Sequence, residues 1–298
     1  MLLQLPHLGE ILALSCAITW AIAVILFRKS GETVTPVGLN LFKNCLALIL
    51  FIPTSLVLGV ALLPEASPND YLILLASGVL GIALSDTLFF KSLNLLGAEL
   101  SAIVDCLYSP FIIGLSVIFL ADAMSGLQIF GVFLIVSAVL GVSGIGDRKH
   151  ISRHDLILGV VLGVLAMASM AVGIVMIKPL LNRSPLLWVV EVRLLAGCVG
   201  LGIYLLFHPG RRRIVGSVLS MKNWRYMLPG SLLGAYLSMV IWMGGMKYTQ
   251  TSIASALNQT SNVFVFILAA ILLREPVNLT RILAIIFAFA GAAVVSLG

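Results

Sequence analysis

The sequence contains ten runs of about 20 mostly apolar residues, separated by short polar stretches. A helix needs roughly 20 apolar residues to cross the hydrocarbon core of a bilayer. Inside lipid, only helices and closed barrels satisfy their backbone polar groups, and continuous rather than alternating apolarity excludes a barrel. We therefore expect an all-α integral membrane protein with spans at residues 9–27, 37–62, 70–91, 98–120, 126–145, 156–177, 186–207, 226–247, 251–273 and 278–297.

Composition agrees with this interpretation, because 60% of the 298 residues are hydrophobic and only 10% are charged. Soluble domains carry about 25% charged residues. The net charge of +6 does not indicate a nucleic-acid partner, since the basic residues lie between apolar runs. The sequence contains no glycine-rich phosphate loop of the kind that binds ATP, so nothing in it indicates an ATP-driven process. We also expect no cofactor. Neither a disulfide nor a metal site is expected, because the cysteines all lie inside apolar runs without CxxC spacing: Cys16, Cys45, Cys106 and Cys198.

Lysine and arginine are distributed unevenly between the two sides of the predicted bundle. Thirteen follow odd-numbered spans, whereas three lie on the opposite side: Lys178, Arg183 and Lys247. Because basic loops stay in the cytoplasm, we expect a multi-pass protein of the inner (cytoplasmic) membrane with both termini outside. The first run is followed by Arg28 and Lys29 and has no basic region before it, so we expect a span rather than a signal peptide.

The two halves of the chain resemble each other. A shift of 150 residues lays Arg28 on Lys178 and Lys43 on Arg193. A shift of 153 lays Gly81 on Gly234, Ser85 on Ser238 and Asp122 on Glu275. Five spans per half is an odd number, so the halves must be inverted relative to each other, as in many secondary transporters. We predict one repeat over residues 1–146, a cytoplasmic linker at 147–155 and a second repeat over 156–298.

The stretch 272–281, followed by the small residues 290–292, resembles the acidic turn between the last two helices of each repeat in the EamA-type drug/metabolite transporters. The first repeat has a related turn at 120–124 and a fourth span with small residues followed by Pro110, whereas Val263 stands where the second repeat of that family often has proline. The resemblance implies a secondary carrier, frequently an exporter of amino acids or other metabolites, with a cavity between its halves.

Three ionisable residues of the first half are predicted to share one depth. At about 1.5 Å of rise per residue, Lys43 lies about 9 Å, Asp86 about 8 Å and Asp105 about 10 Å from the cytoplasmic ends of their spans. Charges inside a membrane need partners or a wet cavity. The three residues form either a structural ion cluster or a transport site in which one carboxylate binds a proton. In such a site, Lys43 either tunes the pKa of that carboxylate or meets an anionic group of the substrate.

The second half is less acidic. Glu191 and Arg193 lie five to seven residues into the seventh span and point to different faces, because they are two residues apart. Asn258 takes the position of Asp105, and Met239 takes that of Asp86. The remaining candidates for substrate or ion contacts are the amides that follow on the ninth span, Gln259 and Asn262.

Pro110 should kink the fourth span, either as a fixed bend or as a moving hinge. Among the aromatic residues, Trp20, Tyr108 and Trp242 are deep enough to line a cavity, whereas Trp188 and Tyr248 lie near span ends and are expected to be interfacial anchors.

Two carboxylates in short turns, Asp122 and Glu275, are expected to serve the fold by capping the helix that follows each of them. His150 and His154 have metal-binding spacing beside Asp155, but a solvated linker does not favour such a site.

The function that we expect is secondary transport of small polar or zwitterionic metabolites, driven by protons or by the solute gradient. Partners are then the substrate, membrane lipid and, in the first case, protons; the protein is a monomer or a homodimer. A facilitative channel or an intramembrane enzyme acting on lipid are the alternatives. The enzyme would require a clustered nucleophile and base, yet the histidines lie in predicted loops: His7, His150, His154 and His208.

Overall fold

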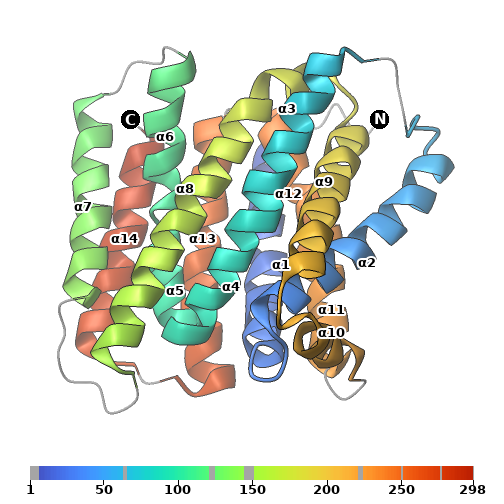
Figure 1. Cartoon of the computed structure of the whole chain (residues 1–298). Coiled ribbons are helices and arrows are strands. Elements are labelled where there is room, and N and C mark those ends of the chain that lie inside the picture. Colours follow the sequence, from blue (N-terminus) through green and yellow to red (C-terminus); the bar gives the residue numbers. More distant parts are fainter. Residues whose placement is uncertain are drawn as a thin grey trace.

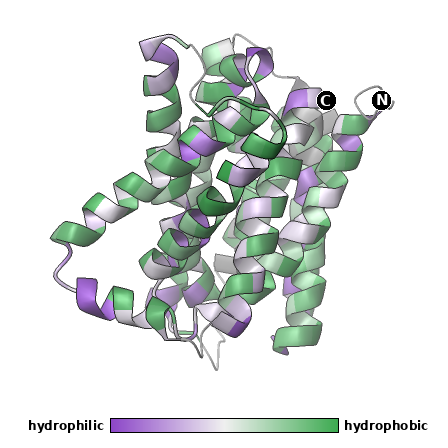
Figure 2. Ribbon diagram, turned by 90° about the vertical axis from the view of Figure 1, so that its right-hand side faces the viewer, coloured by the Kyte–Doolittle hydropathy of each residue, from purple (hydrophilic) through white to green (hydrophobic). Residues whose placement is uncertain are grey.

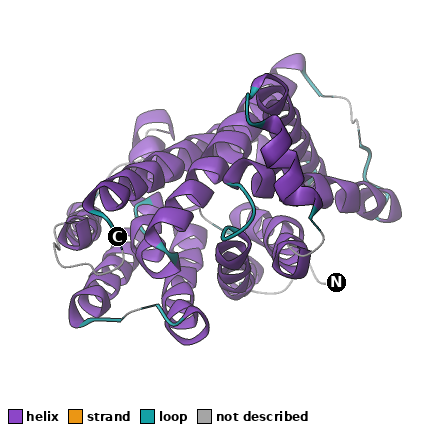
Figure 3. Cartoon of the chain, turned by 60° about the horizontal axis from the view of Figure 1, so that its bottom comes forward, coloured by secondary structure: helices purple, strands orange, loops and turns teal. Residues whose placement is uncertain are grey.

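The computed structural model describes residues 7–62, 66–120, 125–143, 151–220, 224–249, 251–275 and 277–297. Within these ranges every regular element is helical (Figure 3). The elements, with η marking π-helical segments, are α1 (Leu8–Ser30), α2 (Pro36–Val57), α3 (Pro68–Gly78), η2 (Val79–Leu84), α4 (Ser85–Leu96), α5 (Ala98–Asp105), α6 (Tyr108–Leu120), α7 (Gly126–Ser143), α8 (Arg153–Arg183), α9 (Leu186–Phe207), α10 (Arg211–Leu219), α11 (Trp224–Ser231), η4 (Leu232–Leu237), α12 (Ser238–Tyr248), α13 (Thr251–Leu268), η5 (Ala269–Leu273) and α14 (Leu279–Leu297).

The predicted all-α membrane architecture is confirmed. Seven helical stretches of the described chain are long and apolar enough to cross a membrane, and three shorter apolar helices correspond to the other predicted spans. Hydrophobic residues cover much of the long helices in Figure 2. Many are exposed on the outside of the bundle, as Ile49 and Leu56 of α2 are. In a soluble protein such surfaces would be unfavourable, whereas here they face lipid.

Local sequence signals set several helix ends. Thr35 and Ser67 accept hydrogen bonds from the first turns of α2 and α3, and a proline occupies the first position of each helix. α2 ends at Val57, five residues earlier than predicted, because Gly59 adopts a φ of +66° that stops the helix. α8 begins at Arg153, so the last residues of the expected linker are already helical; residues 144–150 lie outside the described residues.

A π-helical segment interrupts the third span and recurs at the same place in the eighth. η2 spans Val79–Leu84, and η4 begins and ends 153 residues after it, at Leu232–Leu237. Two further contacts are counterparts: Ser85 donates to the carbonyl of Ala166, and the Cys16 thiol donates to the carbonyl of Ser238. The span containing α4 therefore packs on α8 as the span containing α12 packs on α1.

The repeats interlock along two seams, each formed by a helix and its own counterpart. α7 packs against α14 on the left side of the bundle in Figure 1, and α2 packs against α9 on its right side. Cys45 and Cys198 face each other across the second seam, with their sulfur atoms 3.7 Å apart. The short helix α10, absent from the prediction, lies at the end of the bundle where α9 ends (Figure 1). Its three arginines are exposed.

Candidate functional site

A cavity lies in the middle of the bundle and is lined by side chains of both repeats. It contains about 880 Å³ of space free of protein atoms, its open part included. That size suits a small molecule. Of the twelve residues predicted to bind, couple or move, all but Glu191 and Pro110 line it: Lys43, Asp86, Asp105, Arg193, Asn258, Gln259, Asn262, Trp20, Tyr108 and Trp242.

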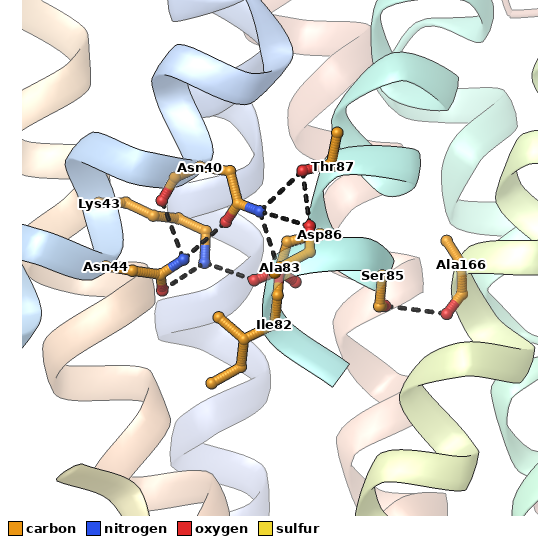
Figure 4. A network of polar contacts seen from close by, with 9 residues as sticks. All are labelled: Asn40, Lys43, Asn44, Ile82, Ala83, Ser85, Asp86, Thr87 and Ala166. Atoms are coloured by element: carbon orange, nitrogen blue, oxygen red, sulfur yellow. Dashed lines mark hydrogen bonds and ion pairs between the residues drawn. The ribbon is translucent and has the colours of Figure 1, made fainter. Parts of the chain in front are cut away.

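Lys43 and Asp86 form a buried ion pair on the wall of the cavity (Figure 4). Nζ of Lys43 lies 2.6 Å from Oδ2 of Asp86 and donates a second hydrogen bond, 3.1 Å long, to Oδ1 of Asn44. The ammonium also lies 5.8 Å from the ring centroid of Phe90, within the range of a cation–π contact. Two charges that are otherwise costly in a membrane therefore neutralise each other.

Asn40 ties this pair to the π-helical segment η2. A π-helical turn disturbs the regular i→i−4 hydrogen bonds and leaves carbonyl groups available. Nδ2 of Asn40 donates to the carbonyls of Ile82 and Ala83, at 2.9 and 3.1 Å, while its Oδ1 accepts from Asn44 (Figure 4). The irregular backbone of η2 thus fixes both amides, and these in turn hold Lys43 beside Asp86.

Asp105 faces the same cavity but joins no ion pair within the described chain. It is the last residue of α5, and the span is broken at residues 106–107 before α6 begins. Pro110 explains the break, because it lacks an N–H for the carbonyl of Cys106 and its ring crowds that carbonyl. α13 runs unbroken through Val263, the counterpart of Pro110. The bend expected at Pro110 is present; its movement stays a prediction.

Two amides of α13 support the broken corner between α5 and α6. Nε2 of Gln259 donates to the backbone carbonyl of Asp105 at 3.5 Å. Nδ2 of Asn262 donates to the sulfur of Cys106 at 3.3 Å and also to Oε1 of Gln259. Asn258, the counterpart of Asp105, has a buried Oδ1 without a hydrogen-bond partner among the described residues.

Arg193 reaches the cavity from α9 and is 2% exposed. Its Nε donates to Oγ of Ser77 at 3.0 Å, and its Nη1 approaches the sulfur of Met243 at 3.6 Å. Ser77 is fixed by donating to the carbonyl of Gly173. No carboxylate of the described chain lies within 4.0 Å of the Arg193 guanidinium.

Glu191 points away from the cavity, toward α2, as its spacing from Arg193 predicted. Its Oε1 accepts from Oγ of Ser55 at 2.5 Å, while Oε2 is buried without a partner among the described residues. Glu191 is 6% exposed and no cation of the described chain pairs with it. The prediction that it contributes to a site remains untested, and the geometry separates it from the other candidates.

The aromatic candidates form two groups in the cavity wall. Trp20 packs on Phe89, with ring centroids 6.1 Å apart, and Tyr108 lies 6.4 Å from Trp242. The expectation that Trp188 is an interfacial anchor is wrong, because it is 1% exposed and packs edge-on against Tyr71 in the core. Tyr248 is 45% exposed at the end of α12, and its role as an interfacial anchor stays a prediction.

Glu275 serves a different helix from the one expected. Its two oxygens accept from the backbone nitrogens of Ala98 and Glu99, each at 2.9 Å, so it caps α5 of the other repeat. The expectation that it caps the following helix is wrong: the first turn of α14 is capped by Asn278 instead. Asp122, the other predicted cap, lies outside the described residues.

Sequence reasoning missed one ion pair at this end of the bundle. Nη1 of Arg281 lies 2.5 Å from Oε2 of Glu99, whose side chain is fully buried. The sequence signal for this pair was Glu99 itself, a carboxylate in the first turn of an apolar span that needs a partner. In the described chain no group of three or more metal-ligating residues occurs; His154 contacts Asp155, and His150 lies outside the described residues.

Comparisons with known proteins agree with this architecture. A sequence model of the EamA-like transporter family matches residues 7–144 and 157–297, one match for each predicted repeat. An uncharacterized transporter of Archaeoglobus fulgidus is 24% identical over 281 residues, which cover 93% of each protein. A solved structure, described only as that of a protein, superposes with a TM-score of 0.69 at 17% identity, over 97% of this chain and 96% of that one, which shows the same fold.

Proposed function

Because the chain belongs to the EamA-like transporter family, we propose that it is a secondary active transporter of small polar metabolites, such as amino acids or related solutes. We propose that it works as an exporter by alternating access in the inner membrane, with both termini outside. The observation that carries the proposal is the central cavity, whose polar lining comes from both repeats. Substrate sites of carriers built from inverted repeats lie at the repeat interface near the midplane.

The two repeats contribute different chemistry to the cavity. The first supplies the Lys43–Asp86 pair and the carboxylate of Asp105, and the second supplies Arg193 and the amides of α13. A substrate held between them contacts both repeats at once. Rocking of one repeat against the other would then open the site to each side in turn.

Proton coupling, if the carrier is proton-driven, is assigned to Asp105. Asp86 is engaged by Lys43 at 2.6 Å, whereas Asp105 faces the cavity without a cation partner in the described chain. It also lies at the break between α5 and α6, where a change of charge acts on an irregular part of the backbone.

The two alternatives have less support. A lipid-acting enzyme needs a nucleophile beside a base, but the described histidines lie at helix ends away from the cavity: His7, His154 and His208. A channel needs a continuous path, whereas paired and unpaired charges at one central site suit binding and release better.

Counterflow in proteoliposomes tests the proposal. Vesicles are loaded with one unlabelled metabolite at a time from a screen of amino acids and related solutes, and uptake of the labelled compound is followed. A carrier gives transient accumulation that saturates with concentration. Flux that rises linearly and never exceeds equilibrium would indicate a channel, and chemical conversion of an added lipid would indicate an enzyme.

A further inference from the structure

The two repeats place a cation at equivalent positions, but among the described residues only the first of these cations forms an ion pair with a carboxylate. Lys43 and Arg193 are related by a shift of 150 residues, and Asp86 and Met239 by a shift of 153. Lys43 pairs with Asp86. Met239 lines the cavity and offers no charge to Arg193.

The surroundings of Arg193 leave much of its hydrogen-bonding capacity unused. Ser77 takes Nε, and the Met243 sulfur at 3.6 Å is a weak acceptor. A Cβ on Gly81 would lie only 3.1 Å from Nη2, so the glycine lets the guanidinium lie close to η2 at the cavity wall. A buried guanidinium without a carboxylate partner is unfavourable unless an anion arrives from elsewhere.

Two other donors of the cavity wall lack hydrogen-bond partners among the described residues. Oη of Tyr108 and Nε1 of Trp242 are buried, and neither has a hydrogen-bond partner among the described residues. Their rings lie 6.4 Å apart, and both the Tyr108 hydroxyl and the Asp86 carboxylate, which Lys43 already engages, are within electrostatic reach of the Arg193 guanidinium. Buried donors of native proteins are normally satisfied, so these two unsatisfied donors in the wall that also holds Arg193 indicate a missing acceptor.

We infer that the substrate of the proposed carrier, on which this inference rests, has an anionic oxygen group that binds Arg193 with help from Tyr108 and Trp242. The group is a carboxylate or a phosphate monoester, because both match the planar fork of a guanidinium. The substrate thereby supplies the charge that Met239 does not. Lys43, which the sequence suggested for this role, is occupied by Asp86.

Thermal stabilisation of the purified protein measures binding without requiring transport. Two series of probes are compared: carboxylates beside their primary amides, beginning with phenylalanine and phenylalaninamide, and phosphate monoesters beside their parent alcohols, beginning with glycerol 3-phosphate and glycerol. We expect anions of one series, and not their neutral partners, to raise the melting temperature. The series that responds identifies the source of the anion.

Variants connect the binding to the proposed residues. Arg193→Gln should weaken binding of the stabilising anion by about 100-fold, because the charge is lost. Tyr108→Phe removes only a hydroxyl, and Trp242→Phe replaces the indole and its N–H by a smaller ring; each should weaken binding by about tenfold. Met239→Asp should abolish binding by giving Arg193 an internal partner. Arg225→Gln, at an exposed arginine outside the cavity, is the matched control and should bind normally.

Several results would overturn the inference: neutral partners that stabilise as well as the anions, unchanged binding in Arg193→Gln, or no stabilisation in either series. Counterflow separates this failure from that of the carrier. A neutral solute that shows counterflow in both wild type and Arg193→Gln would overturn the anion site alone. An anion that binds through Arg193 and shows no counterflow would contradict the carrier alone.

Discussion

Nζ of Lys43 lies 2.6 Å from Oδ2 of Asp86, and this buried pair joins α2 to α4 within the first repeat. The counterparts in the second repeat are Arg193 and the uncharged Met239, which both line the cavity. The repeats are therefore alike in backbone and different in charge. One cation is satisfied within the protein, and the other is available to a ligand.

The Lys43–Asp86 pair is expected to stabilise the fold. Lys43→Met should lower the free energy of unfolding by about 3–5 kcal/mol, because it leaves the Asp86 carboxylate buried and unpaired. The double variant Lys43→Met/Asp86→Leu should recover most of this loss. Thermal and denaturant unfolding of the single and double variants measure the coupling, and equal, additive losses would contradict it.

Asp105 is expected to couple transport to protons, if the carrier is proton-driven. Asp105→Asn should keep counterflow but lose accumulation driven by an imposed pH gradient, since exchange requires binding without net proton movement. Asp86→Asn is the comparison and should keep pH-driven accumulation to the extent that it folds. Normal pH-driven accumulation in both variants would assign the three charges to structure alone.

Glu275→Gln is expected to lower stability by about 1 kcal/mol, because one of the two backbone nitrogens of α5 loses its carboxylate acceptor. Substrate affinity should stay near normal. Glu32→Gln, at an exposed carboxylate near the same end of the bundle, is the control and should change neither property. An unchanged melting temperature combined with abolished binding would contradict the structural role of Glu275.

The predicted topology places α10 in the cytoplasm. In a cysteine-free background, Gly216→Cys should react with an impermeant thiol reagent only after cells are permeabilised. The substitution is tolerated by geometry, since a Cβ at Gly216 meets no atom within 4 Å. A cysteine added after Gly298 should react in intact cells. The opposite pattern of labelling would contradict the predicted topology and would place α10 outside and the C-terminus in the cytoplasm.

The spans were predictable because lipid imposes their length and apolarity, and the observed helices match the ten predicted runs to within a few residues in most cases. The end of α2 was missed because a single residue, Gly59, stops it by its positive φ. The π-helical segments could not be predicted, since η2 and η4 consist of ordinary apolar residues. α10 is too short and too basic to resemble a span.

Most residues of the cavity could be predicted from their positions inside the spans, because charged and amide side chains within a membrane need polar partners or a wet cavity. These positions could not distinguish a paired charge from an unpaired one. Whether Lys43 joins a structural ion cluster or meets the substrate therefore stayed open until its contact with Asp86 was seen, and Glu191 remained a site candidate, although it faces Ser55. Glu275 shows the same limit, because its partners lie in the other repeat, 177 residues away in sequence.

Alternating exposure of the cavity is the central claim, and accessibility of Met170→Cys tests it most directly. Met170 lines the cavity from α8. In a cysteine-free background, inside-out and right-side-out vesicles of known orientation are treated with an impermeant thiol reagent, with and without saturating substrate. We predict that the cysteine reacts from either side and that substrate protects it from both. Reaction from one side only, under every condition, would contradict alternating access.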